Sequence, residues 1–165
     1  MLKSLLIVTA VVASASNYVA AEATVRVEPS NLKGPRELQE QTSAAVIRDY
    51  LKAWQGFREA LGQNRPDLLA ADFVGTSKDK LTETIQQQAA LGIRTKYQDL
   101  SHDLQIVFYS PEGLSIELTD TVEYEVQVLD HEKVTATQRV NAHYIVVMTP
   151  AEVRWRVRVF QSVPE

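Results

Sequence analysis

Apolar and polar residues alternate through the final part of the chain, from Leu114 to Val159. An alternation of period 2 is typical of strands with one buried and one exposed face, so three antiparallel strands are predicted here. Pairing Val128 with Val134 across a short turn makes most of the later pairs on that face apolar, ending with Ile116 opposite Val146. This register defines the first predicted hairpin.

A second hairpin is predicted by pairing Met148 with Val153. This pairing places Trp155 opposite Val146 and Val157 opposite Tyr144, and it puts Val159 opposite Ala142. All of these residues then share the buried face of the first hairpin. The three strands therefore form one sheet with a continuous apolar side.

Helical periodicity precedes the strands. Apolar residues recur at helical spacing from Leu38 to Leu61, after Pro35, which favours the first turn of a helix. A short helix is predicted from Asp67 to Phe73 and a third from about Ser77 to Leu91, and strands begin near Ile93. The expected fold class is α+β, with three N-terminal helices packed on a curved antiparallel sheet of four to five strands.

The N-terminal residues, 1–21, have the pattern of an export signal. Lys3 precedes the apolar run from Leu5 to Ala13, and small residues place cleavage near Ala15 or Ala21. Polar residues interrupt the run too early for a stable membrane anchor. We expect an exported protein, periplasmic or extracellular, with a linker or loose arm at 22–34 and a single domain at 35–165.

Composition narrows the chemistry. The net charge of −4 argues against binding to nucleic acid, and the absence of cysteine excludes disulfides and thiol catalysis. The three histidines, His102, His131 and His143, lack the spacing that would bring two imidazoles to one metal ion. No metal site and no cofactor are expected.

Asp120 is the one acidic residue on the apolar face, between Leu118 and Val122. The predicted register sets it opposite Ala142, where small neighbours leave room beside it. A carboxyl group in such a place is the usual origin of a general acid or base. Two other arrangements remain open, because a bulge could turn Asp120 outward or a backbone amide could pair with it.

Side chains that combine a ring or apolar body with a polar tip gather on the same face. Such residues line apolar ligand pockets with a few orienting groups, and they also fill ordinary cores. The candidate pocket residues are Trp54, Tyr124, Gln138 and Ala142, and the candidate hydroxyl donors are Tyr50 and Tyr144.

Charges of both signs occupy the opposite, outer face of the predicted sheet. Glu123 falls opposite Arg139, and the arginine row continues with Arg154, Arg156 and Arg158. One interpretation is a ladder of ion pairs, and the other is a site for an anion or a partner protein. With Ile145, Val147 and Phe160 interspersed, this face is the expected homodimer surface.

The element order, closing with the strand Trp155 to Phe160, resembles that of the nuclear transport factor 2-like superfamily. This superfamily includes ketosteroid isomerases and polyketide cyclases. The resemblance extends from about Glu37 to Val163 and implies a cystatin-like cone, in which a curved sheet wraps the helices. In the isomerases an acid and a tyrosine form an oxyanion hole. Tyr50 could supply the hydroxyl, whereas the acid position aligns with Ala142.

Two functions follow. The first is a small exported domain that binds a small apolar ligand in the cone or serves as a non-catalytic association module. The alternative is an isomerase, hydrolase or cyclase, with Asp120 as general acid or base and Tyr50 or Tyr144 as donor.

Overall fold

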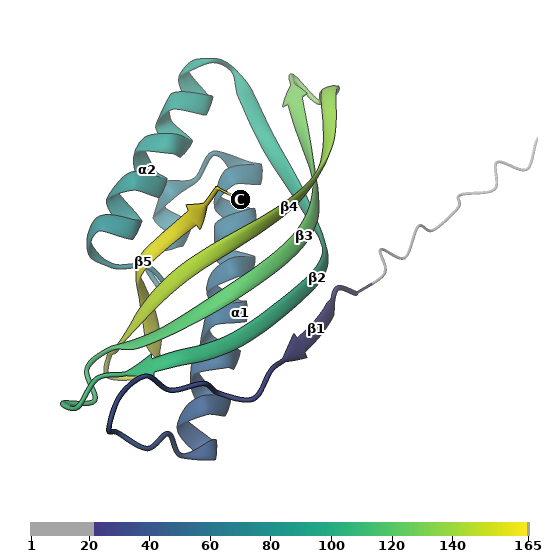
Figure 1. Ribbon diagram of the computed structural model, residues 1–165. Helices are drawn as coiled ribbons and strands as arrows, with labels where there is room; N and C mark the ends of the chain where they lie inside the picture. Colours follow the sequence, from purple (N-terminus) through teal and green to yellow (C-terminus); the bar gives the residue numbers. More distant parts are fainter. Residues whose placement is uncertain (1–21, 165) are drawn as a thin grey trace, which may run out of the picture.

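The computed structural model describes residues 22–164, which form one curved sheet wrapped around a long helix (Figure 1). The export signal expected at 1–21 lies outside these residues. The sheet has five strands in the order β1-β2-β3-β4-β5. The elements are β1 (Thr24–Val27), α1 (Glu40–Gln63), the 3-10 turn η1 (Pro66–Leu69), α2 (Gly75–Ala90), β2 (Ile93–Tyr109), β3 (Ile116–Asp130), β4 (Lys133–Pro150) and β5 (Trp155–Val163).

The predicted α+β class is confirmed, but the predicted number of helices is wrong. Within residues 22–164 there are two α-helices, and the segment predicted as a short helix from Asp67 to Phe73 contains only η1. The reason is a backbone connection to β5. Val157 donates to the carbonyl of Asp72 and accepts from Val74, which holds this stretch extended. Of these two helices, neither is long and apolar enough to cross a membrane.

The segment expected to be a linker or loose arm contains β1. Its residues Thr24–Val27 pair in parallel with Ser101–Leu104 of β2, so the sheet is mixed rather than antiparallel. The chain then continues along β2, where Glu28 donates to the carbonyl of Leu104. The free edge of β2 offers unpaired backbone groups, and the N-terminal segment satisfies part of them.

The β3–β4 register differs from the predicted register by two residues. The turn contains only His131 and Glu132, both with positive φ, and beside it Thr135 of β4 is an unpaired bulge residue between the pairs Leu129–Val134 and Val128–Ala136. Asp120 consequently pairs with Tyr144 instead of Ala142. From Val128 and Ala136 onward the shift is even, so these side chains stay on their predicted faces, whereas Val134, nearer the turn, pairs with Leu129 and is exposed.

The register between β4 and β5 also differs from the predicted register. In the second half of β5, the residues predicted to face the core face outward, and the reverse. Met148 pairs with Val157, and a bulge at Arg158 then brings Val159 opposite Val147. Because a bulge adds one residue, Val159 turns outward and Phe160 turns into the core. The expectation that Phe160 lies on the outer face is therefore wrong.

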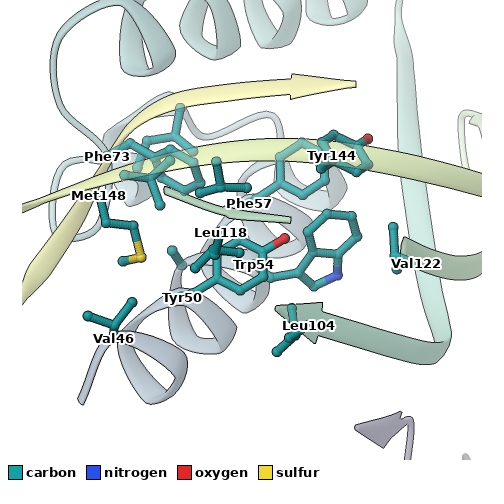
Figure 2. Packing of buried hydrophobic residues seen from close by; sticks show 14 of the residues in the cluster. Val46, Tyr50, Trp54, Phe57, Phe73, Leu104, Leu118, Val122, Tyr144 and Met148 are labelled. Carbon is teal, nitrogen blue, oxygen red and sulfur yellow. The ribbon is translucent and has the colours of Figure 1, made fainter. Parts of the chain in front are cut away.

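The core lies between α1 and the concave side of the sheet (Figure 2). Trp54 is 2% exposed and stands at its centre, with Tyr50 one helical turn earlier and Tyr144 facing both from β4. Trp155 is only half-buried, and its ring meets the edge of Tyr109 at 6.5 Å. The buried aromatic residues of the core are thus contributed mainly by α1 and the middle of the sheet.

Candidate functional site

Asp120 is completely buried on the concave face of β3. It pairs regularly with Leu104 on β2 and Tyr144 on β4, so no bulge turns it outward. The hydroxyl of Tyr50 donates to Asp120 Oδ2 at 2.6 Å, and His102 Nδ1 lies 2.8 Å from the same oxygen. Asp120 Oδ1 has no hydrogen-bond partner among the described residues.

His102 reaches this carboxyl group from β2. Since Leu104 pairs with Asp120, His102 is the next residue along β2 on the same face. Its ring is 3% exposed and meets the ring of Trp54 edge-on at 5.1 Å. The other ring nitrogen, Nε2, lies 3.6 Å from Oδ2 of Asp99. The bulge at position 100 lets Asp99 face the same side as His102.

Asp99 connects the cluster to α1. It accepts a hydrogen bond from Trp54 Nε1 at 2.8 Å, and Arg58 Nη1 lies 2.9 Å from its second oxygen. A continuous set of contacts therefore crosses the interior from the middle of α1 to the sheet and back. We call this set the buried polar chain; it consists of Tyr50, Asp120, His102, Asp99, Trp54 and Arg58.

The buried polar chain favours a positive charge on His102. Burial alone would lower the pKa of His102, but hydrogen bonds to Asp120 and Asp99 outweigh it and raise the pKa to about 9. For Asp99, burial opposes ionisation, yet contacts with His102, Trp54 and Arg58 keep its pKa below the ordinary value. Burial, together with Asp120, raises the pKa of Tyr50 well above that of a free tyrosine.

The chemistry available to this cluster is proton exchange between His102 and Asp120, with Tyr50 as a hydrogen-bond donor. Access is limited, because Asp120 is 0% and His102 only 3% exposed. The buried polar chain comes nearest the surface at Asp99. This residue lines an open hollow of about 430 Å³ together with Arg58 and Tyr97. Among residues 22–164, no group of histidine and acidic side chains is arranged to hold a metal ion.

The residues predicted to line a ligand pocket have two different environments. Trp54, Tyr124 and Tyr144 are buried in the core, and Ala142 is half-buried beside them. The ring of Tyr144 stacks on Phe160 with 4.7 Å between centroids. Gln138 is exposed, contrary to its predicted place, because the first half of β4 belongs to the hairpin end that the helices leave uncovered (Figure 1).

The predicted outer-face charges are only partly brought together. Arg139 Nε donates to Glu123 Oε1 at 2.6 Å, although Arg139 pairs with Glu125 in the ladder. Arg154 precedes β5 and donates to Asp72 instead of joining the outer face. Arg156 and Arg158 line two separate hollows. The expected continuous row of arginines is therefore wrong.

The sequence interpretation missed His102 as a partner of Asp120, and it missed Asp99 and Arg58 as further members of the buried polar chain. The sequence did contain a signal for His102. Leu104 and Ile106 lie on the buried side of a strand with period 2, and His102, two residues before Leu104, lies on the same side. The bulge at position 100 breaks that alternation before Asp99. Sequence periodicity alone therefore could not place Asp99 beside His102.

No protein-family model and no curated protein sequence matches the chain. Solved structures with a similar fold do match. The intermembrane space region of the chloroplast protein ARC6 superposes with a TM-score of 0.62 at 18% identity, over 79% of this chain and 100% of that chain. A proposed scytalone dehydratase from Novosphingobium aromaticivorans gives 0.54 at 14% identity, over 76% of this chain and 89% of that one.

A proposed dehydratase of the NTF2-like family from Streptomyces avermitilis gives a TM-score of 0.49 at 10% identity, over 74% of this chain and 98% of that one. Identities this low describe the fold and leave the activity open. The element order, the curved sheet around α1 and the two superpositions with TM-scores of 0.62 and 0.54 agree with one another. The protein therefore has the nuclear transport factor 2-like cone fold.

Proposed function

We propose that the protein is an exported, non-catalytic association domain that forms a homodimer through the outer face of its sheet. The observation that carries this proposal is the filling of the cone by aromatic rings. A domain whose interior is occupied by its own side chains has its outer surface available for function. The helices cover the concave side of the sheet and leave the other side open (Figure 1).

The rings inside the cone are in mutual contact. The ring of Trp54 lies 5.4 Å from that of Tyr144 and 5.7 Å from that of Phe160, centroid to centroid. Phe57 lies 5.3 Å from Tyr97. Centroid distances of about 4.5 to 7 Å are those of packed aromatic pairs. The interior thus offers little space to the small apolar ligand considered from the sequence.

The outer face combines apolar residues with charges of both signs. Val147 and Val159 pair there across β4 and β5, and Ile145 follows on β4. Glu123 and Arg139 form an ion pair on the neighbouring strands. A surface with both signs can match a second copy of itself across a twofold axis, because an acid on one copy meets a base on the other.

A charge at the centre of the outer face tests the dimer. We expect the chain from residue 22 onward to sediment as a dimer, and Val147→Glu to sediment as a monomer, because a lone carboxylate would be desolvated in the interface. Val153→Glu is the matched control, since Val153 is 83% exposed outside this face. Sedimentation equilibrium over a dilution series gives the masses. A wild-type chain that stays monomeric throughout would refute the proposed dimer.

A second candidate function is an enzyme of the isomerase, hydrolase or cyclase kind. One observation favours it, namely that Asp120 Oδ1 is buried with no partner among residues 22–164, while Tyr50 and His102 contact Oδ2. Buried polar atoms are usually satisfied, so an unpaired carboxyl oxygen is a place where a reacting group could bind. This function requires the aromatic side chains around Asp120 to move and admit a substrate.

The enzyme alternative predicts a specific loss. With a ketosteroid and an epoxide as probe substrates, turnover by the wild type should fall about 10²- to 10⁴-fold in Asp120→Asn, which keeps the shape but removes the acid. Circular dichroism should show that the variant stays folded. Thr121→Ala, a change on the opposite side of β3, is the control and should retain turnover. Equal rates in wild type and Asp120→Asn would exclude Asp120 as the general acid or base.

A further inference from the structure

We propose that a hollow beside the β4–β5 loop binds a carboxylate attached to a short apolar group, and that Arg156 is its main contact. The hollow has a volume of about 360 Å³. Its walls come from the β4–β5 loop, the start of β5 and the segment before α2, and they are Ala71, Ala151, Glu152, Val153, Arg154 and Arg156. None of these residues belongs to the buried polar chain. This inference is independent of the proposed dimer.

Arg156 is a cation without a protein partner in the described part of the chain. Its Nε atom is buried and has no hydrogen-bond acceptor there. The ion pairs between described residues include Arg154 and exclude Arg156. Because no described acid pairs with the Arg156 guanidinium, an anion that enters the hollow and contacts its accessible part would be favoured.

Arg154 is held in place beside Arg156. Its Nη1 atom donates to Asp72 Oδ1 at 3.0 Å, and the Asp72 side chain is only 8% exposed. A Cβ on Gly56 would stand 3.2 Å from Asp72 Oδ2, so the lack of a side chain at Gly56 lets Asp72 lie close against α1. Asp72 balances the charge of Arg154 and fixes its position. Of the two arginines in this lining, Arg156 is therefore the one that forms no ion pair with another described residue.

The lining selects the kind of anion. A guanidinium group matches a carboxylate with two parallel hydrogen bonds. Ala71, Ala151 and Val153 supply apolar walls for a short hydrocarbon group. Glu152 adds a negative charge to the lining, which disfavours a dianion such as phosphate. A volume of about 360 Å³ suits a small ligand or one terminal residue of a peptide.

Butyrate is the probe for this site, followed by NMR of the backbone amides. We expect saturable shifts at Ala71 and from Val153 to Arg156, with no such shifts from butyramide and weaker binding of inorganic phosphate. Arg156→Gln should weaken butyrate binding by about tenfold or more, because the charge and the fork of donors are lost. Arg26→Gln is the matched control, since Arg26 is paired with Asp103 and Glu28 elsewhere, and it should bind butyrate as the wild type does.

A second variant separates charge from geometry. Arg156→Lys keeps the charge without the planar fork and should bind butyrate less tightly than the wild type. Tighter binding of a short peptide with a free carboxyl end than of its amidated form would identify a chain terminus as the source of the carboxylate. Equal affinity of the two peptides would identify a free acid. Equal shifts from butyrate and butyramide, or wild-type affinity in both Arg156 variants, would overturn the proposal.

Discussion

Replacing Trp54 by alanine should lower the free energy of unfolding by about 3 to 5 kcal/mol. The side chain is 2% exposed and contacts the ring of Phe57 on its own helix and three tyrosine or phenylalanine rings on the sheet. Its loss would leave a large cavity and would also remove the indole hydrogen bond to Asp99. Urea denaturation followed by far-ultraviolet circular dichroism measures the change.

Two further variants serve as comparisons for Trp54→Ala. Trp54→Phe keeps a ring but loses the N–H donor, so it should fall between wild type and alanine. Leu91→Ala alters a side chain that is 74% exposed and should stay within about 0.5 kcal/mol of wild type. A loss below about 1 kcal/mol for Trp54→Ala would show that the interior is loosely packed. The small-ligand interpretation would then return.

The residues on the buried face of β3 could be predicted, because successive side chains of a strand alternate between its two faces. The pairing of β3 with β4 could not be predicted, because it depends on the turn at His131 and Glu132. Both residues have positive φ, and neither is the Gly or Asn that normally indicates such a turn. The predicted pairing was therefore displaced by two residues, which kept Asp120 inside and changed its neighbour to Tyr144.

In β5 the same reasoning reached the wrong face for Phe160. A single extra residue at Arg158 reverses the alternation, and nothing in the local sequence indicates the bulge. The position is explained by packing, because the ring of Phe160 fills the space between Trp54 and Phe73. Bulges that serve tertiary packing are set by residues distant in sequence, which a local pattern does not contain.

The candidate site was predictable to a similar extent. The sequence predicts Asp120 as the acid and leaves the hydroxyl donor open between Tyr50 and Tyr144; in the structure the hydroxyl of Tyr50 lies 2.6 Å from Asp120 Oδ2. His102 required the β2–β3 pairing, which only the fold supplies. Gln138 lies on the same side of β4 as the buried residues. It is nevertheless exposed, because exposure depends on where the helices end. Sequence periodicity therefore predicts which side of the sheet a side chain lies on, but it does not predict how deeply that side chain is buried.

The stability of the protein should fall as the pH rises from about 6.5 to 9, because of His102. The folded-state pKa of about 9 lies above the unfolded value of 6.5. A group with a raised folded pKa contributes fully below its unfolded pKa, and this contribution is lost as the pH rises through the folded value. At roughly 1.4 kcal/mol per pKa unit, the total loss is on the order of 3 kcal/mol.

The groups that face His102 explain why the imidazolium matters. Asp120 and Asp99 approach its two ring nitrogens, while Tyr50 donates to the same oxygen of Asp120 and Arg58 contacts Asp99. Removing the cation by His102→Leu would leave the two acids without their shared partner, at a cost of about 3 to 5 kcal/mol near pH 7. The same change should abolish the decline in stability between pH 6.5 and 9.

Urea denaturation at a series of pH values tests both effects. His143→Leu is the matched control, because His143 lies on the outer face and contacts Thr121 rather than a buried acid. The control should keep the wild-type dependence on pH, with a change in stability within about 1 kcal/mol. If the wild-type curve is flat between pH 6.5 and 9, or if His102→Leu retains the decline, then His102 is not a buried cation. The polar chain would in that case hold α1 to the sheet through neutral hydrogen bonds alone.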